Sequence, residues 1–576
     1  MLPTDSHSPL RGDATNSRQT FQKVDRWLAQ CNSHRTCHEW SALIGSTKAT
    51  PTRLLAVEDG LVNPHVRLTL STELTQCHPL YTTLSYCWGK EPPIRLLEEN
   101  ITNYQQDIPW IELPLTFKEA IEVTLRLGMT YMWIDALCII QDSQEDWLQE
   151  SARMAEVYSN CYLNISADAS SDANGGLFRS RNPDTHNSFQ ILSSSRIPYL
   201  CYSPRWRRDV ELSPLKKRAW VVQERFLAPR VVHFSDSQIH WECAELITSE
   251  GVPDTLYVAP RTTLTFRKSS ACSDSMGGSE QVEGRYRLWN RLVESYSCGR
   301  LTFPTDRPLA IAGLSRAMGH LIGLDPEDYI CGHWRPYLIA ELMWVSSSST
   351  SRPLSGFSSW SWLSIDGGII NGCSWAYSCQ QWQPIAEFLE PIFQSKRPNT
   401  HFGSASIRLR GPACQAIIST PEISTYDPVS GSCWTIAIGE YLLHEGNHFI
   451  LSLDERNDAA VSRICGCELL LFLCGTTVST RHLADPSFRR YDELASDRVQ
   501  TARLEFEQDV RIGTTAFSCL VLKPVDDPGT FQRVGAIEFV GEPQIGLLAE
   551  VFYGAGLANK NHGDVNEKIM REVILM

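Results

Sequence analysis

The sequence predicts an α/β domain with a mostly parallel sheet, followed by a helical segment and a β-rich C-terminal region. Three observations predict this order. Strand-like and helix-like patterns alternate between residues 51 and 250, which is typical of helices packed on a parallel sheet. Helical patterns then cover residues 282–360. Short apolar runs separated by Gly, Pro and Asp fill residues 361–576, as expected for a β-rich region.

The N-terminus is predicted to start with a disordered stretch and to continue as a helical segment. Residues 1–20 are polar and aperiodic, so we expect disorder there. In residues 21–50 the apolar side chains of Phe21, Val24 and Trp27 recur at helical spacing. The first ordered element is therefore expected to begin near Phe21.

The first half of the α/β domain is predicted to hold three strands and a helix. PTRLLAV and HVRLTL are short strand-like runs, and YTTLSYCW ends sharply at Gly89. The helix over residues 113–128 has Thr116 and Glu119 at the spacing of a capping box and Gly128 at its end.

The second half repeats the pattern. The apolar run over residues 131–140, interrupted by Asp135, is typical of a buried parallel strand. A helix follows, then the strand YLNISA, and then a helix from near Arg218 that ends before Pro229 and leads into the strand RVVHF. Residues 251–281 are small, polar and turn-rich, which indicates a linker.

Composition excludes several classes of protein. The formal net charge of −14 opposes general binding to nucleic acid or to an anionic membrane. No apolar stretch reaches the roughly 18 residues that a membrane-spanning helix needs, and the N-terminus lacks the apolar core of a secretory signal. We therefore expect a cytoplasmic protein whose 19 cysteines are mostly reduced and buried.

One group of residues has the composition of a metal site. Cys31, His34, Cys37 and His38 are zinc-ligand types, but they lie within eight residues of one another. Structural zinc sites usually draw ligand pairs from separated segments. The favoured interpretation is therefore a packed helix end with no metal, and these four residues remain the weak metal candidates.

Common nucleotide and hydrolase motifs are absent from the sequence. Gly554 and Gly556 lack the third glycine and the βαβ context of a dinucleotide fingerprint, and no phosphate loop, HExxH or G-x-S-x-G occurs. Cys87 and Cys138 are candidate nucleophiles. Both lie in apolar strand patterns, which favours inert core thiols.

Several polar and aromatic residues fall where predicted strands end. Trp88 and Gly89 close one strand, Asp135 interrupts another, and Glu224 lies on a short helix one turn after Trp220. Ligands of open parallel sheets collect at the carboxyl ends of strands, so these residues can meet at one site. The alternatives are a turn or cap at Asp135, a core position for Trp88, and a surface ion pair of Glu224 with a neighbouring arginine.

These segments together resemble the fungal heterokaryon incompatibility (HET) domain. The resemblance rests on motifs in a fixed order: YTTLSYCWG, LPLTFKEAIEVTLRLGMTYMWIDALCIIQDS, WLQES, MAEVYSNC, GGLF and RAWVVQERFLAPRVVHF. It places a HET domain in residues 51–250. The resemblance implies a role in nonself recognition and regulated cell death when genetically unlike hyphae fuse.

The HET domain is in turn distantly similar to TIR domains, which have a flavodoxin-like fold and include NAD-cleaving enzymes. In those enzymes a glutamate follows a tryptophan by four residues on a helix, and Trp220 and Glu224 have this spacing. The resemblance thus points to Glu224 as the catalytic residue, and the mechanistic hypothesis adds that Asp135, at its strand exit, orients a hydroxyl or the glutamate. Trp88, Gly89, Trp220 and Arg218 would bind NAD, as a substrate and without any required cofactor.

Two function classes remain open. In the first, the chain is an NAD glycohydrolase, with Lys216, Lys217, Arg218 and Arg225 attracting the anionic dinucleotide. In the second, the same fold is a self-associating scaffold that signals through protein partners. An accessible Glu224 would favour the enzyme, and a buried Glu224 in an ion pair would favour the scaffold. A thiol sensor at Cys87 or Cys138 is a third alternative, which requires an exposed thiol of lowered pKa.

Overall fold

The structure is a computed structural model in which the chain divides into two compact units. The first unit holds residues 1–292 and 299–324, and the second holds residues 293–298 and 325–576. The structure describes residues 2–3, 12–44, 49–58, 60, 64–74, 78–90, 94–181, 188–192, 198–202, 205–251, 278–347, 351–371, 382–393, 405–419, 434–438, 441–444, 449–454, 464–478, 515–539, 551 and 569–576. Almost all of the predicted linker at 251–281 lies outside these residues.

An eight-stranded mixed sheet forms the centre of the first unit, with the strand order β11-β10-β9-β6-β4-β5-β2-β3. Its strands are β2 (Arg53–Glu58), β3 (His65–Leu70), β4 (Tyr81–Ser85), β5 (Tyr131–Trp133), β6 (Leu163–Ser166), β9 (Arg230–Phe234), β10 (Ile239–Cys243) and β11 (Ile247–Ser249). The four central strands, β5, β4, β6 and β9, pair in parallel. Both flanks are antiparallel.

The prediction of a mostly parallel sheet is therefore correct only for the centre of the sheet. β2 with β3, and β9 with β10 and β11, are joined by short connections. A short connection can only link antiparallel neighbours, whereas parallel strands need a longer crossover. Within the parallel centre, β5 lies on one side of β4, and β6 and β9 lie on the other. The chain therefore crosses the sheet in one direction from β4 to β5 and in the opposite direction from β5 to β6 and β9, so the strand order reverses between the neighbouring strands β4 and β6.

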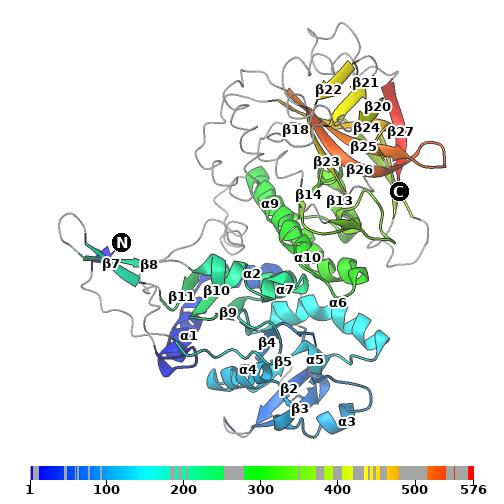
Figure 1. Ribbon diagram of the computed structural model, residues 1–576. Coiled ribbons are helices and arrows are strands. Elements are labelled where there is room, and N and C mark those ends of the chain that lie inside the picture. The colour runs from blue at the N-terminus through cyan, green and yellow to red at the C-terminus, as the bar shows by residue number, and fades with distance from the viewer. Residues whose placement is uncertain are drawn as a thin grey trace. The chain divides into compact units, whose positions relative to one another are not determined.

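Helices provide the crossovers and cover the sheet. The first unit contains α1 (Arg18–Cys31), α2 (Arg35–Ile44), α3 (Ile101–Tyr104), α4 (Leu115–Arg126), α5 (Asp135–Cys138), α6 (Gln144–Asn160), α7 (Trp220–Leu227) and α10 (Arg307–Ile322). Helix α10 packs against α6 and α7 (Figure 1). Gly313 permits this close packing, since a Cβ there would lie 2.6 Å from the Cβ of Ala155.

Part of the N-terminal stretch predicted to be disordered is ordered. Thr15 is buried, its amide donates to the carbonyl of Arg179 at 2.9 Å, and its hydroxyl accepts from the amide of Arg179 at 2.8 Å. Ser17 caps α1 by accepting from the amide of Thr20 at 3.2 Å. Residues 12–20 are thus fixed by partners distant in the sequence, which a polar composition does not reveal.

The predicted capping box of α4 is wrong, although the helix itself is confirmed. Pro114 is the N-cap residue and makes no side-chain cap. The Thr116 hydroxyl accepts from the amide of Gly176 at 3.0 Å, and a Glu119 carboxylate oxygen accepts from the amides of Phe178, at 2.8 Å, and Leu177. The two side chains therefore hold a later loop instead of the helix start.

The second unit is built on a large, almost entirely antiparallel sheet with ten strands. Its strands are β18 (Trp382–Pro384), β19 (Glu387–Ile392), β20 (Ser406–Ser419), β21 (Thr435–Ile438), β22 (Tyr441–His444), β23 (Phe449–Leu453), β24 (Glu468–Val478), β25 (Thr515–Pro524), β26 (Thr530–Phe539) and β27 (Met570–Leu575). Helix α9 (Gly278–Ser297) belongs to the first unit as far as residue 292, and α11 (Leu338–Glu341) belongs to the second unit. The predicted helical and β-rich regions are therefore confirmed.

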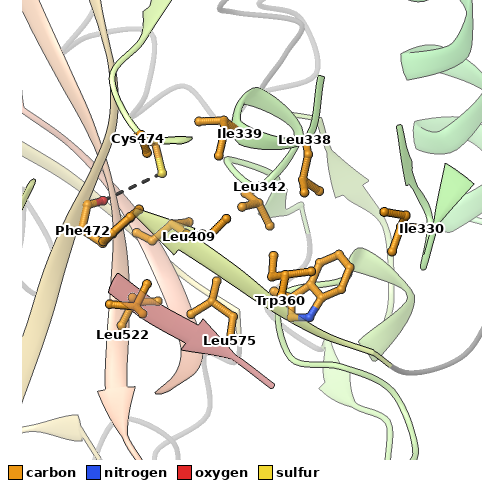
Figure 2. Close-up of a cluster of buried hydrophobic side chains, with 14 of the residues drawn as sticks. Ile330, Leu338, Ile339, Leu342, Trp360, Leu409, Phe472, Cys474, Leu522 and Leu575 are labelled. Carbon is orange, nitrogen blue, oxygen red and sulfur yellow. Dashed lines mark hydrogen bonds between the residues drawn. The ribbon is translucent and has the colours of Figure 1, made fainter. Parts of the chain in front are cut away.

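The core beside α11 shows how this sheet is covered (Figure 2). Leu338 and Ile339 of α11 and the indole of Trp360 pack in one cluster with side chains from the strands, namely Leu409, Phe472, Leu522 and Leu575. The Trp360 indole N–H donates to the carbonyl of Ala405 at 2.9 Å, so its polar atom is satisfied.

Among the described residues, none of the helices has the length and apolar character needed to cross a membrane.

Candidate functional site

The candidate site begins at the carboxyl end of β4, where Ser85 is followed by Tyr86, Cys87, Trp88 and Gly89. Gly89 has a φ of +86°, and a Cβ there would lie 2.6 Å from the Cβ of Asp172. Glycine is therefore required for the turn that follows β4, which explains the sharp end of this strand in the sequence.

Asp135 lies beside this turn. β5 ends at Trp133, and Asp135 starts the short helix α5, so the long apolar run is not one strand as predicted. One carboxylate oxygen of Asp135 accepts from the indole N–H of Trp88 at 2.9 Å, and the other accepts from the amide of Ala136 at 2.7 Å. The ends of two neighbouring parallel strands are thus joined, and the Trp88 ring is held in one orientation.

Glu224 lies on α7 and is 3% exposed, so the accessible carboxyl expected for an enzyme is not found and the buried position expected for a scaffold is. Burial raises its pKa to about 7, although the Arg218 guanidinium and the Ser85 hydroxyl act in the opposite direction. The charge of Asp135 adds to the rise. Its Oε2 atom has no hydrogen-bond partner among the described residues. A buried carboxyl with a strongly shifted pKa beside a charged partner is typical of functional sites.

Arg218 is the positive group of this site. It is half-buried, and its guanidinium donates to the carbonyl of Tyr86. Burial alone would lower the pKa of Arg218, but the charges of Glu224 and Asp135 outweigh burial and raise it. Arg218, Asp135, Trp88 and Glu224 therefore form one electrostatically linked group, which we call the strand-end group. Trp220 is half-buried and lies one turn before Glu224 on α7.

The other predicted positive groups behave differently. The Arg225 guanidinium is buried and donates to Glu242 at 2.6 Å and to Glu211 at 3.0 Å. The Lys216 ammonium is also buried, and burial lowers its pKa. Lys217 is exposed. Only Arg218 and Lys217 can therefore attract an anion from solvent in the way the sequence predicts.

Comparison with known families identifies the segment that carries this group. Residues 81–224 match the family described as Heterokaryon incompatibility protein (HET). Residues 81–224 are a HET domain. The domain begins at the first residue of β4 and ends at Glu224, so it spans the whole strand-end group. No curated protein and no solved structure matches the chain.

The thiols of the HET domain do not have the properties of nucleophiles. Cys87 is buried, and burial raises the pKa of its thiol. Cys138 is fully buried, and burial raises its pKa to about 12. A reactive thiol needs exposure and a lowered pKa. The thiol-sensor alternative is therefore contradicted for both cysteines, and the interpretation as core thiols is favoured.

A buried polar network next to the HET domain was not predicted from the sequence. His233 on β9 contacts Asp168 at 2.8 Å and Glu242 at 3.2 Å. Glu242 also accepts from Arg225 of α7 at 2.6 Å. Burial alone would lower the pKa of His233, but Asp168 and Glu242 outweigh burial and raise it. The available signal was the presence of histidine and glutamate inside the otherwise apolar runs RVVHF and IHWEC.

The metal candidates are only partly brought together. Cys31, His34 and Cys37 form a cluster with Cys243 of β10, which was not among the predicted metal ligands. His38 is not part of the cluster, because its ring is exposed and contacts the carbonyl of Asn32 at 2.9 Å. The donor set therefore has three thiols and one imidazole in place of two of each.

Proposed function

We propose that this protein acts in nonself recognition and regulated cell death, and that its HET domain hydrolyses NAD at the strand-end group. The observation that carries the proposal is the buried Glu224 carboxyl, whose pKa of about 7 and unpartnered oxygen lie beside Arg218 and Asp135. A buried carboxyl with an unpartnered oxygen lowers the free energy of unfolding, and groups of this kind are found mainly at functional sites.

The order of the parallel strands supports a TIR-like fold for this domain. Numbered along the chain, β4, β5, β6 and β9 lie in the order 2-1-3-4. Flavodoxin-like sheets begin with this order and bind ligands where it reverses, at the carboxyl ends of the first and third strands. Ser85, which ends β4, contributes to the environment of Glu224, so the strand-end group lies at the carboxyl end of the first of these strands.

The chemistry follows from the residues present. When the bond between nicotinamide and ribose breaks, its electron pair leaves with nicotinamide and positive charge develops on the sugar. The Glu224 carboxylate would hold the ribose hydroxyls and stabilise that charge. Trp88, oriented by Asp135, would stack on a flat ring, and Arg218 would attract a phosphate. Water then adds to the sugar, giving ADP-ribose, nicotinamide and one proton.

The test measures nicotinamide released from NAD by the purified full-length chain. We expect Glu224→Gln to lower the rate by about 100-fold or more, because the variant cannot stabilise the developing charge. Glu150→Gln is the matched control. Glu150 is also buried with an unpartnered oxygen, but it lies on α6 and accepts from Thr52 at 2.6 Å. Equal rates for wild type and Glu224→Gln would remove Glu224 from the mechanism.

A non-catalytic, self-associating scaffold is the second candidate. The observation that favours it is the 3% exposure of Glu224 together with its attraction to Arg218. Catalysis would require the strand-end group to open before NAD could reach the carboxyl. Absence of nicotinamide release from every variant, combined with cell death on expression of the Glu224→Gln chain in a fungal host, would favour the scaffold.

A further inference from the structure

We propose that Cys31, His34, Cys37 and Cys243 bind a structural Zn²⁺ ion that fastens the N-terminal helices to the end of strand β10. The four ligand atoms lie within 4.8 Å of one another. Three thiolates and one imidazole are a common ligand set of tetrahedral structural zinc sites. The site is separate from the strand-end group and does not depend on the function proposed for it.

The distances fit a zinc tetrahedron. Zn–S bonds of about 2.3 Å and Zn–N bonds of about 2.0–2.1 Å place a sulfur and a nitrogen ligand about 3.6 Å apart at the tetrahedral angle. The Nδ1 atom of His34 lies 3.6 Å from the sulfur of Cys37 and 3.6 Å from the sulfur of Cys243. The same imidazole nitrogen therefore faces both thiols at the separation that a shared metal would require.

The local backbone presents the four donors. Cys31 is the last residue of α1, His34 lies in the turn that follows, and Cys37 lies in the first turn of α2. The turn closes through the amide of His34, which donates to the carbonyl of Cys31 at 3.1 Å. Cys243 ends β10 and comes from the far side of the HET domain in the sequence. The separated segment that zinc sites usually require is therefore present.

Groups around the donors support a metal-bound state. The guanidinium of Arg230 donates to the sulfur of Cys31 at 3.3 Å, and the amide of Leu246 donates to the sulfur of Cys243 at 3.3 Å. Both contacts stabilise thiolates. On the other side of the imidazole, the Nε2 atom of His34 lies 4.0 Å from a carboxylate oxygen of Glu245. A carboxylate behind a histidine ligand orients the ring and is a regular feature of zinc sites.

The charges also balance. Three thiolates and Zn²⁺ carry one net negative charge, and Arg230 lies against one of the thiolates. Cys31, Cys37 and Cys243 are buried and free of disulfides. Without a metal, three thiols would be buried together with an imidazole that can satisfy them only weakly. The metal would hold α1 and α2 against β10, where Trp27 of α1 already packs on Trp241 of β10 with ring centroids 6.0 Å apart.

The first test is elemental analysis of the full-length chain purified under reducing conditions. We expect about one zinc per chain and at least tenfold less in Cys243→Ser. Two matched controls should keep the metal: His38→Ala removes the neighbouring imidazole, and Cys161→Ser removes a buried thiol outside the cluster. Any of three results would overturn the proposal. The chain could remain free of zinc after incubation with Zn²⁺, or it could contain iron in place of zinc. The folded Cys243→Ser variant could also bind as much zinc per chain as the wild type.

A second test covers the case in which Cys243→Ser does not fold. Replacement of zinc by Co²⁺ in the wild type should give thiolate-to-metal charge-transfer absorption and the intense visible bands of a tetrahedral site. His34→Cys should keep the metal and raise the charge-transfer intensity by about one third, since four thiolates replace three. Octahedral cobalt spectra, or an intact mass that shows a disulfide among the three cysteines, would contradict the site. Neither readout uses NAD, so failure here is distinguishable from failure of the proposed activity.

Discussion

Replacing Arg225 by methionine is expected to lower the free energy of unfolding of the first unit by about 3–5 kcal/mol. Arg225 is 3% exposed and donates to Glu242 at 2.6 Å and to Glu211 at 3.0 Å. Its guanidinium carbon also lies 5.4 Å from the centroid of the Trp206 ring. Methionine retains much of the packing volume but removes all of these polar contacts.

The size of the effect follows from what remains after the substitution. Glu242 is completely buried, and after the substitution it keeps the contact with the Nε2 atom of His233 at 3.2 Å, whose Nδ1 atom faces Asp168 at 2.8 Å. A buried carboxylate that loses the guanidinium charge beside it has less compensation for the cost of desolvation. The loss is therefore expected to exceed that of an exposed ion pair, which is worth about 0–1 kcal/mol.

Hydrogen exchange of the amides in β9 and β10 is the appropriate measurement, because it reports the local stability of this unit alone. The matched control is Arg67→Met, which removes a half-exposed arginine 3.2 Å from Glu58. The stability of Arg225→Lys should lie between those of Arg225→Met and Arg67→Met, because lysine keeps the positive charge but cannot reproduce the fork geometry with which the guanidinium reaches both glutamates. Equal exchange in Arg225→Met and Arg67→Met would mean that the network does not stabilise the fold.

Local patterns in the sequence were sufficient to predict most elements of the first unit. The helix that ends at Leu227 and the strand that starts at Arg230 follow from Pro229, because proline cannot continue a helix. The antiparallel flanks of the sheet were missed because strand direction depends on connection geometry, which apolar runs do not encode. Thr116 and Glu119 had the spacing of a cap, but the loop at residues 176–178 competes for their oxygens.

In the candidate sites, too, the sequence predicted few of the contacts between residues that lie far apart in the chain. The structure joins Trp88 to Asp135, and the sequence could predict this because parallel strands end at one edge of a sheet. Cys243 could not be paired with Cys31 from the sequence, since the whole HET domain separates the two residues. His233 and Glu242 were visible as polar residues in apolar runs, but the identity of their partners is decided by tertiary packing.

Replacing Glu224 by glutamine is expected to stabilise the first unit at pH 8 and to have little effect near pH 4. The unfolded chain loses the Glu224 proton near the ordinary pKa of 4.5, whereas the folded chain keeps it until about pH 7. Between these values the folded state binds more protons, so the free energy of unfolding falls as pH rises. Above pH 7 the wild type thus carries a cost on the order of 3 kcal/mol, which an uncharged glutamine of the same shape avoids.

Hydrogen exchange of β4 and β6, recorded for wild type and Glu224→Gln at several pH values, measures this difference directly. Glu122→Gln is the control, because it changes a half-exposed carboxylate paired with Arg126 on the surface of α4 and should alter stability little at any pH. If Glu224→Gln were less stable than the wild type at pH 8, the attraction between Glu224 and Arg218 would outweigh the burial cost. Glu224 would then be a structural group, as a scaffold requires. A stabilising substitution that abolishes nicotinamide release would instead identify a carboxylate kept for chemistry at the expense of stability.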